Sequence, residues 1–155
     1  MIHRERMTGR VEGEFAVFLI GMRVNRFWKL HKWWPVAAAM PRMLRELYSR
    51  PELGLLSHEM WFSRTVILVQ YWRSVEALLA YATAKGSEHL PAWKEFNRLI
   101  GSDGSVGIWH ETYRIAPGNY EGVYVNMPAF GLGRAGRLVS AQGTLATATG
   151  RLKQP

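Results

Sequence analysis

The chain has 155 residues, of which 48% are hydrophobic and 12% aromatic, enough for the core of one globular domain. It has no cysteine, which excludes disulfides, zinc–thiolate sites, iron–sulfur clusters and cysteine nucleophiles. The net charge of +8 raises nucleic acid or anionic lipid as partners, but the basic residues are dispersed along the chain, which favours a solvated basic surface and no nucleic-acid site.

The amino-terminal segment is charged, and the apolar stretch FAVFLIGM that follows is much shorter than the roughly 20 residues needed to span a bilayer. No transmembrane segment and no cleavable signal peptide is recognisable. We therefore expect a cytoplasmic protein.

The first expected strand covers residues 15–24, a continuous apolar run rich in β-forming residues. Apolar residues then recur at helical spacing over residues 30–48, until Pro51 ends the pattern. Pro35 and Pro41 fall inside this helix. Because a proline in a helix interior costs about 3 kcal/mol, we expect a kink or a fresh start near one of them.

Residues 53–62 and 65–72 are two strand-like runs separated by hairpin spacing, so they should pair antiparallel. Ser74 can cap the helix that follows, which has its apolar stripe over residues 75–82.

The pattern of this second helix is interrupted at residues 85–91 and resumes from Trp93 to Ile100, before a last strand at residues 106–115. The order βαββαβ predicts an α+β, ferredoxin-like fold with both helices on one face of an antiparallel sheet. The other face has apolar residues too, and a second copy of the chain is the simplest cover for it.

Three segments are expected along the chain. Residues 1–14 form an amino-terminal arm, residues 15–136 the folded domain, and residues 137–155 a tail. The tail is rich in Ala, Gly, Thr and Ser, so we expect it to be mobile or to wrap around a partner.

Two sequence motifs resemble known functional sites, but the residues around them do not support those functions. Residues 131–136, GLGRAG, match a dinucleotide-binding fingerprint, but no Asp or Glu follows Glu121 to hold a ribose, so a turn is favoured. The dipeptides His58-Glu59 and His110-Glu111 resemble half of a zinc-protease motif. Both lie on expected strands, where neighbouring side chains face opposite sides, so no metal site is predicted.

Several polar side chains could carry chemistry. His89, beside the break in the second helix, could act as acid, base or haem ligand, or simply lie at a helix end. On the last strand, either His110 lies in an intrachain pocket while Glu111 and Tyr113 face a partner, or the reverse. The sequence does not choose between these two arrangements. A further candidate, Asn25, lies at a strand end beside the expected pocket.

Four ordered segments resemble one known family: YWRS at 71–74, HLPAW at 89–93, GIWHETY at 107–113 and NMPAFGLG at 126–133. The chain is similar to the monooxygenase-like family of unknown function that includes the fumagillin-type fungal monooxygenase, within the dimeric α+β barrel superfamily. The resemblance implies a homodimer of ferredoxin-like protomers, each with a pocket between sheet and helices.

The resemblance also implies an activity. We expect a small monooxygenase that oxidises a hydrophobic or aromatic molecule with dioxygen and no cofactor. The alternatives are a haem protein with His89 or His110 as axial ligand, or a binding module without catalysis. The candidate catalytic residues are His89, His110 and Glu111. The candidate substrate-binding residues are Asn25, Trp72, Trp93, Tyr113 and Asn126.

Overall fold

The protein is described by a computed structural model that covers residues 1–84, 86, 94, 96–98 and 103–153. Its elements in chain order are β1 (Met7–Arg10), β2 (Phe15–Val24), α1 (Leu30–Ser49), η1 (Pro51–Leu53), β3 (Leu55–Trp61), β4 (Thr65–Trp72), α2 (Val75–Thr83), β5 (Val106–Ile115), α4 (Leu132–Ala135), β6 (Arg137–Ser140), η2 (Gly143–Ala146) and α5 (Ala148–Leu152). Among the helices in these described stretches, none is long and apolar enough to cross a membrane.

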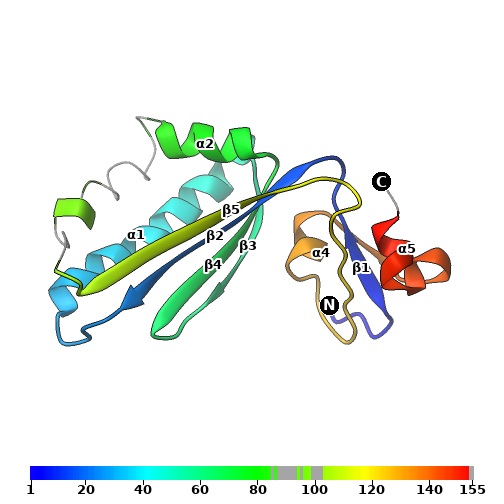
Figure 1. The fold of residues 1–155 in the computed structure, drawn as a ribbon, viewed down its shortest axis with the longest axis horizontal. Coiled ribbons are helices and arrows are strands. Elements are labelled where there is room, and N and C mark those ends of the chain that lie inside the picture. The colour runs from blue at the N-terminus through cyan, green and yellow to red at the C-terminus, as the bar shows by residue number, and fades with distance from the viewer. Residues whose placement is uncertain (85, 87–93, 95, 99–102, 154–155) are drawn as a thin grey trace.

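The main sheet has four strands in the order β3-β4-β2-β5, and every neighbouring pair is antiparallel. With α1 and α2 on one side of it, this is the ferredoxin-like α+β arrangement predicted from the sequence (Figure 1). Both β2 and β5 have the predicted bounds, and β3 and β4 form the predicted hairpin.

Helix α1 is one continuous helix that includes Pro35 and Pro41, so of the two expected alternatives the fresh start at a proline does not occur. Ala39, Leu44 and Leu47 are buried along its inner side, and their packing against the sheet offsets the missing backbone hydrogen bonds. Helix α2 begins as predicted, with the Ser74 hydroxyl accepting a hydrogen bond from the amide of residue 77 at 3.1 Å. The predicted break and resumption of this helix lie largely outside the described residues.

Two clusters of buried side chains form the core between the sheet and the helices. One cluster contains Ala16, Leu44, Leu47, Leu55, Leu68, Trp72, Leu78 and Tyr81. The other contains Met22, Val24 and Val106, at the far end of β2. Because β2 contributes to both clusters, it links the two ends of the core.

The opposite side of the main sheet, called the open face below, is not covered by α1 or α2. Alternation along the paired strands places Val17, Leu19, Ile67, Val69 and Tyr113 on it. All except Tyr113 are half-buried, and Tyr113 is exposed. Helix α4 contacts the β3–β4 edge of this sheet, and the Phe130 ring meets Trp61 edge-on at 6.1 Å between centroids.

The two ends of the chain form a second, smaller unit beside the main sheet (Figure 1). β1 pairs antiparallel with β6, so the segments expected to be a separate arm and a mobile tail form one sheet together. The Arg151 side chain is 4% exposed and donates to Glu121 Oε2 at 2.7 Å. Residues 137–140 and Arg151 of the expected tail are thus held by contacts within the same chain. Glycine allows the two ends of the chain to pack closely here, because a Cβ on Gly9 would lie 2.7 Å from the Gly133 nitrogen.

Candidate active site

A cavity of about 590 Å³ lies between the main sheet and the helices α1 and α2. Its wall includes Leu68 and Leu78 from one core cluster and Met22 and Val24 from the other. The remaining described lining residues are Phe18, Ile20, Gly21, Phe27, Trp33, Trp34, Val36, Ala37, Ala39, Met40, Pro41, Met43, Met60, Phe62, Ser63, Val66, Leu79, Ala82, Phe96, Ile108, His110 and Thr112. A mostly apolar wall with a few polar groups is typical of a site for a hydrophobic small molecule.

His110 is the only residue with an ionisable side chain among the described residues that line this cavity. It lies on β5, and its ring packs against Phe18 at 5.7 Å between centroids. Thr112, two residues further on the same strand face, adds a hydroxyl to the same wall. Among the described lining residues, one imidazole and the hydroxyls of Ser63 and Thr112 therefore lie within a mostly apolar surface.

Glu111 and Tyr113 lie on the open face, away from this cavity. The Tyr113 hydroxyl donates a hydrogen bond to Glu111 Oε2 at 2.5 Å, and this bond to a carboxylate raises the pKa of Tyr113. Of the two arrangements that the sequence left open, the structure has the one in which His110 is on the helix side. The candidate residues of β5 are thus divided between the two faces.

The remaining described candidates do not converge on His110. Trp72 is 1% exposed in the core and donates to Gln70 Oε1 at 2.9 Å. Asn25 donates from Nδ2 to the Gly104 carbonyl at 3.1 Å. Asn126 is exposed, with a positive φ of 55°, in the connection between β5 and α4. The candidates His89 and Trp93 lie outside the described residues.

The helix α1 and the β3–β4 turn contribute wall residues that the sequence analysis did not single out. Trp33, Met40 and Met43 lie on α1, and Phe62 lies at the turn. The helical spacing of apolar residues on α1 predicted a face toward the sheet. Residues that pack in a core and residues that line a cavity recur at the same spacing, so the pattern does not distinguish them. Phe62, an aromatic residue at an exposed turn, was the more informative sign of a cavity border.

The other histidine–glutamate dipeptide is also divided between the two faces. His58 Nδ1 is 2.7 Å from the Tyr48 hydroxyl on α1, and burial lowers the pKa of His58. Glu59 lies on the open face, where Oε1 accepts from the Gly131 amide at 2.9 Å and pairs with Arg134 at 3.4 Å. Within the part of the chain that the structure describes, no group of His, Asp or Glu side chains could hold a metal ion.

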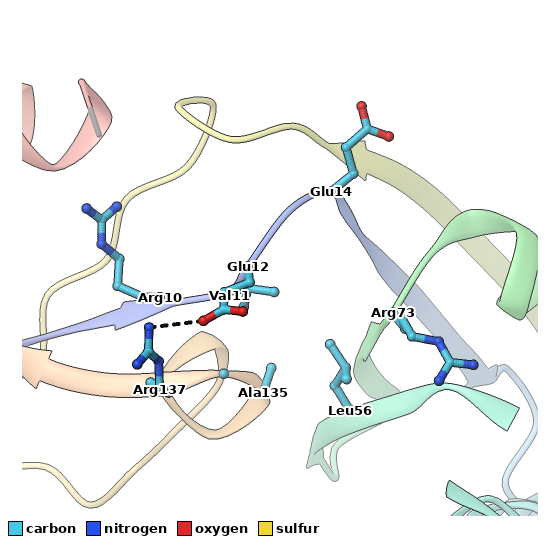
Figure 2. Close-up of a pocket in the computed structure, with 9 residues that line it drawn as sticks. Arg10, Val11, Glu12, Glu14, Leu56, Arg73, Ala135 and Arg137 are labelled. Atoms are coloured by element: carbon cyan, nitrogen blue, oxygen red, sulfur yellow. Dashed lines mark hydrogen bonds and ion pairs between the residues drawn. The ribbon is translucent and has the colours of Figure 1, made fainter. Parts of the chain in front are cut away.

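A second cavity, of about 340 Å³, lies where the main sheet meets the smaller unit. Arg10, Arg73 and Arg137 contribute to its wall. Figure 2 shows that Arg10 and Arg73 point away from each other, while Arg137 donates to Glu12 Oε1 at 3.1 Å. Its cationic groups do not converge on one point, so it is a weaker candidate than the apolar cavity.

Comparison with known proteins assigns the chain to a family. The model of the family "Monooxygenase af470-like" matches residues 15–132. The curated protein "Monooxygenase af470" of Aspergillus fumigatus is 28% identical over 141 residues, covering 79% of this chain and 46% of the relative. The chain thus spans about half the length of that relative.

Two solved structures are similar in fold. An aldoxime dehydratase superposes with a TM-score of 0.67 at 16% identity, over 85% of this chain and 40% of that one. SnoaB, described as a cofactor-independent oxygenase from Streptomyces nogalater, gives a TM-score of 0.47 at 13% identity, over 64% of this chain and 91% of that one. The family match covers most of the chain, including the cavity-lining strands β2 and β5, and the chain belongs to the Monooxygenase af470-like family.

Proposed function

We propose that this chain is a small monooxygenase domain that oxidises a hydrophobic or aromatic molecule with dioxygen, without a cofactor, in the cavity beneath α1. The observation that carries the proposal is the position of His110, the one ionisable side chain among the described residues of a mostly apolar wall. Family membership supports the reaction class. The substrate, the absence of a cofactor and the role of each residue are parts of the proposal.

His110 acts as the base in this scheme. A neutral imidazole accepts the proton from an acidic C–H of the bound substrate, and the resulting carbanion reduces dioxygen and combines with it. For a substrate with an activated CH2 group, the peroxide formed in this way loses water and leaves a carbonyl. One oxygen atom enters the product, the other leaves as water, and the substrate supplies all four electrons.

The wall around His110 has two further roles. The His110 side chain is exposed in the single chain, so a hydrophobic substrate packed against Phe18 and Ile108 would have to displace water, which would otherwise protonate the carbanion. The Thr112 hydroxyl is suited to donate a hydrogen bond to the oxyanion that develops on the substrate. The sequence analysis gave binding roles to Asn25, Tyr113 and Asn126, but the described cavity wall contains none of these three.

The test uses anthrone, an aromatic ketone with an acidic ring CH2, with oxygen uptake and quinone absorbance measured on chelator-treated protein. We expect His110→Ala to lower kcat by about 100-fold or more, the usual range for loss of a general base. The matched control is His31→Ala, an exposed histidine on α1 that is not part of the cavity wall. Equal turnover by His110→Ala and the wild type would contradict the assignment, and ligand binding without turnover would favour the non-catalytic alternative.

A haem protein is the second candidate, and one observation favours it. His110 on an apolar wall is a suitable axial ligand, and haem would supply oxygen activation when bound. Haem-degrading members of the superfamily have an Asn, Trp and His pattern that Asn25, Trp72 and His89 match only loosely, and Asn25 and Trp72 are not brought together in the structure. Trp72 pairs with Ala16 of β2, and Asn25 lies nine residues after Ala16. At about 3.3 Å per residue, Asn25 is about 30 Å from Trp72 along the strand. A Soret band that appears on adding haemin and is lost in His110→Ala would favour this candidate.

The open face supports the proposal of a homodimer. Val17, Leu19, Ile67 and Val69 form a half-buried apolar surface that neither α1 nor α2 covers. The same surface of a second copy could pack against it about a two-fold axis. A charge at its centre should separate the subunits. We expect Val69→Glu to give a monomer in size-exclusion chromatography with light scattering, whereas a wild type that is already monomeric would contradict the proposal.

A further inference from the structure

Large apolar side chains are exposed at one end of the main sheet. We call this group the aromatic rim; it consists of Phe27, Trp28, Leu30, Trp34 and Phe62. Trp28 is 78% exposed and Phe62 is 76% exposed. Several large exposed apolar residues together cost solubility, so such a patch indicates a surface that meets another apolar phase.

Backbone pairing and one ion pair bring the rim segments together. The Val24 amide donates to the Arg64 carbonyl at 3.0 Å, which joins the end of β2 to the β3–β4 turn. Lys29 Nζ pairs with Asp103 Oδ2 at 3.0 Å, which joins the start of α1 to the segment before β5. Figure 1 shows the connection between β2 and α1, the β3–β4 turn and the start of β5 at the end of the main sheet that lies away from the smaller unit.

The rim is also the border of the apolar cavity. Phe27, Trp34 and Phe62 line the cavity, and each is more than half exposed. These side chains therefore connect the interior of the cavity with the outside. A molecule held at these three side chains therefore touches the same cavity wall to which His110 belongs.

Basic side chains are interspersed with the rim residues. In segments 23–34, 62–65 and 103–105, the basic residues are Arg23, Arg26, Lys29, Lys32 and Arg64, and Asp103 is the one acidic residue. Asp103 pairs with Lys29, so this end of the described molecule has a net positive charge. Its charge is therefore complementary to an anionic surface.

We propose that the aromatic rim docks the protein reversibly on a membrane that contains anionic phospholipid. Tryptophan flanked by Lys and Arg suits the boundary between acyl chains and headgroups, where the ring is partly apolar and the cations meet lipid phosphates. Docking places the cavity border against the lipid, so a hydrophobic substrate enters from the bilayer. This delivery step rests on the proposed function, whereas the docking itself does not.

Docking is tested by co-sedimentation of the full chain with phosphatidylcholine vesicles, with and without phosphatidylserine. We expect binding to the phosphatidylserine vesicles that weakens as salt increases, because the attraction between the surfaces is screened. Arg26→Gln should lower the partition constant about fivefold, because one basic residue near an anionic membrane surface contributes about 1 kcal/mol to binding. Trp28→Ser should weaken it about tenfold, because an indole ring no longer enters the interface.

Two matched controls change the same properties away from the rim. Arg45→Gln removes one positive charge from an exposed position on α1, and Val125→Ser removes an exposed apolar group from the β5–α4 connection. Both should bind vesicles as the wild type does, and circular dichroism verifies that all variants are folded. Anthrone turnover without vesicles should be unchanged in Trp28→Ser, which separates docking from the proposed catalysis.

The proposal is overturned if the wild type does not sediment with phosphatidylserine vesicles at low salt. It is also overturned if Arg26→Gln and Trp28→Ser bind as well as the two controls. A further contrary result is that Trp28→Ser converts a dimer into a monomer while vesicle binding is absent, because the rim would then be a contact between two copies of the chain.

Discussion

Filling the cavity tests whether the space beneath α1 is a preformed binding site. Ala37 lies on α1, is half-buried and lines the cavity, whereas the neighbouring Ala38 is half-buried but is not part of the wall. The substitution Ala37→Leu adds three carbon atoms to the wall. A cavity of about 590 Å³ has room for them without displacement of the sheet.

The expected gain in stability follows from transfer of these carbons out of water. Each buried carbon group contributes about 0.8 kcal/mol, so three contribute about 2.4 kcal/mol. Ordering the leucine side chain costs about 0.5 to 1 kcal/mol. The net increase in the free energy of unfolding is therefore about 1.5 kcal/mol, which corresponds to a rise in Tm of about 3 to 6 °C.

Urea unfolding, followed by tryptophan fluorescence, measures this change, with Ala38→Leu as the matched control. We expect Ala37→Leu to raise the midpoint without changing the slope, and Ala38→Leu to have a smaller effect. Anthrone turnover should fall in Ala37→Leu, because the added side chain competes with the substrate for space. If Ala37→Leu lowers the stability relative to Ala38→Leu, the wall is already close-packed and the reasoning is refuted.

Two further predictions concern the buried charge of the smaller unit and the second histidine–glutamate dipeptide. Arg151→Met should lower the free energy of unfolding by about 3 kcal/mol in urea titration, because Glu121 and the Leu145 and Ala146 carbonyls all lose the buried donor. Arg137→Met, at an exposed pair, should change it by less than about 0.5 kcal/mol, and equal effects would contradict this view of the tail. Burial lowers the pKa of His58, so the unfolded chain binds the proton more tightly. Stability should therefore fall as pH decreases through about 6.5 and level off below the folded pKa. His58→Gln should remove this part of the pH dependence of the urea midpoint, and an unchanged pH profile would show that His58 is not the group responsible.

The elements of the main sheet could be predicted from the sequence because their signals are local. Residues 15–24 and 106–115 are uninterrupted runs of strand-forming residues, and the two strands of the hairpin are separated by a short turn. The facing of β5 could not be predicted in this way. Both faces of this strand carry apolar and polar residues in similar proportion, so only the packing against α1 distinguishes them.

The smaller unit was missed because its signals are not local. The strands β1 and β6 have four residues each, too few to establish a period of two, and they come from opposite ends of the chain. Their pairing depends on close contact between backbones, such as the approach of Gly9 to Gly133. A composition rich in small residues is compatible with a mobile tail and with a tightly packed one, so composition alone does not predict this pairing.

The two histidine–glutamate dipeptides show why a shared motif does not give a shared role. On β3 and on β5 the strand directs the histidine to the helix side and the glutamate to the open face. His58 meets the carboxyl-terminal part of α1, where the Tyr48 hydroxyl lies 2.7 Å from its ring, and is not part of the cavity wall. His110 lies beside Phe18 on the wall of the cavity. The hydrogen bond to α1 occupies His58, whereas His110 lines the cavity, and this difference decides which of the two histidines is available to a substrate.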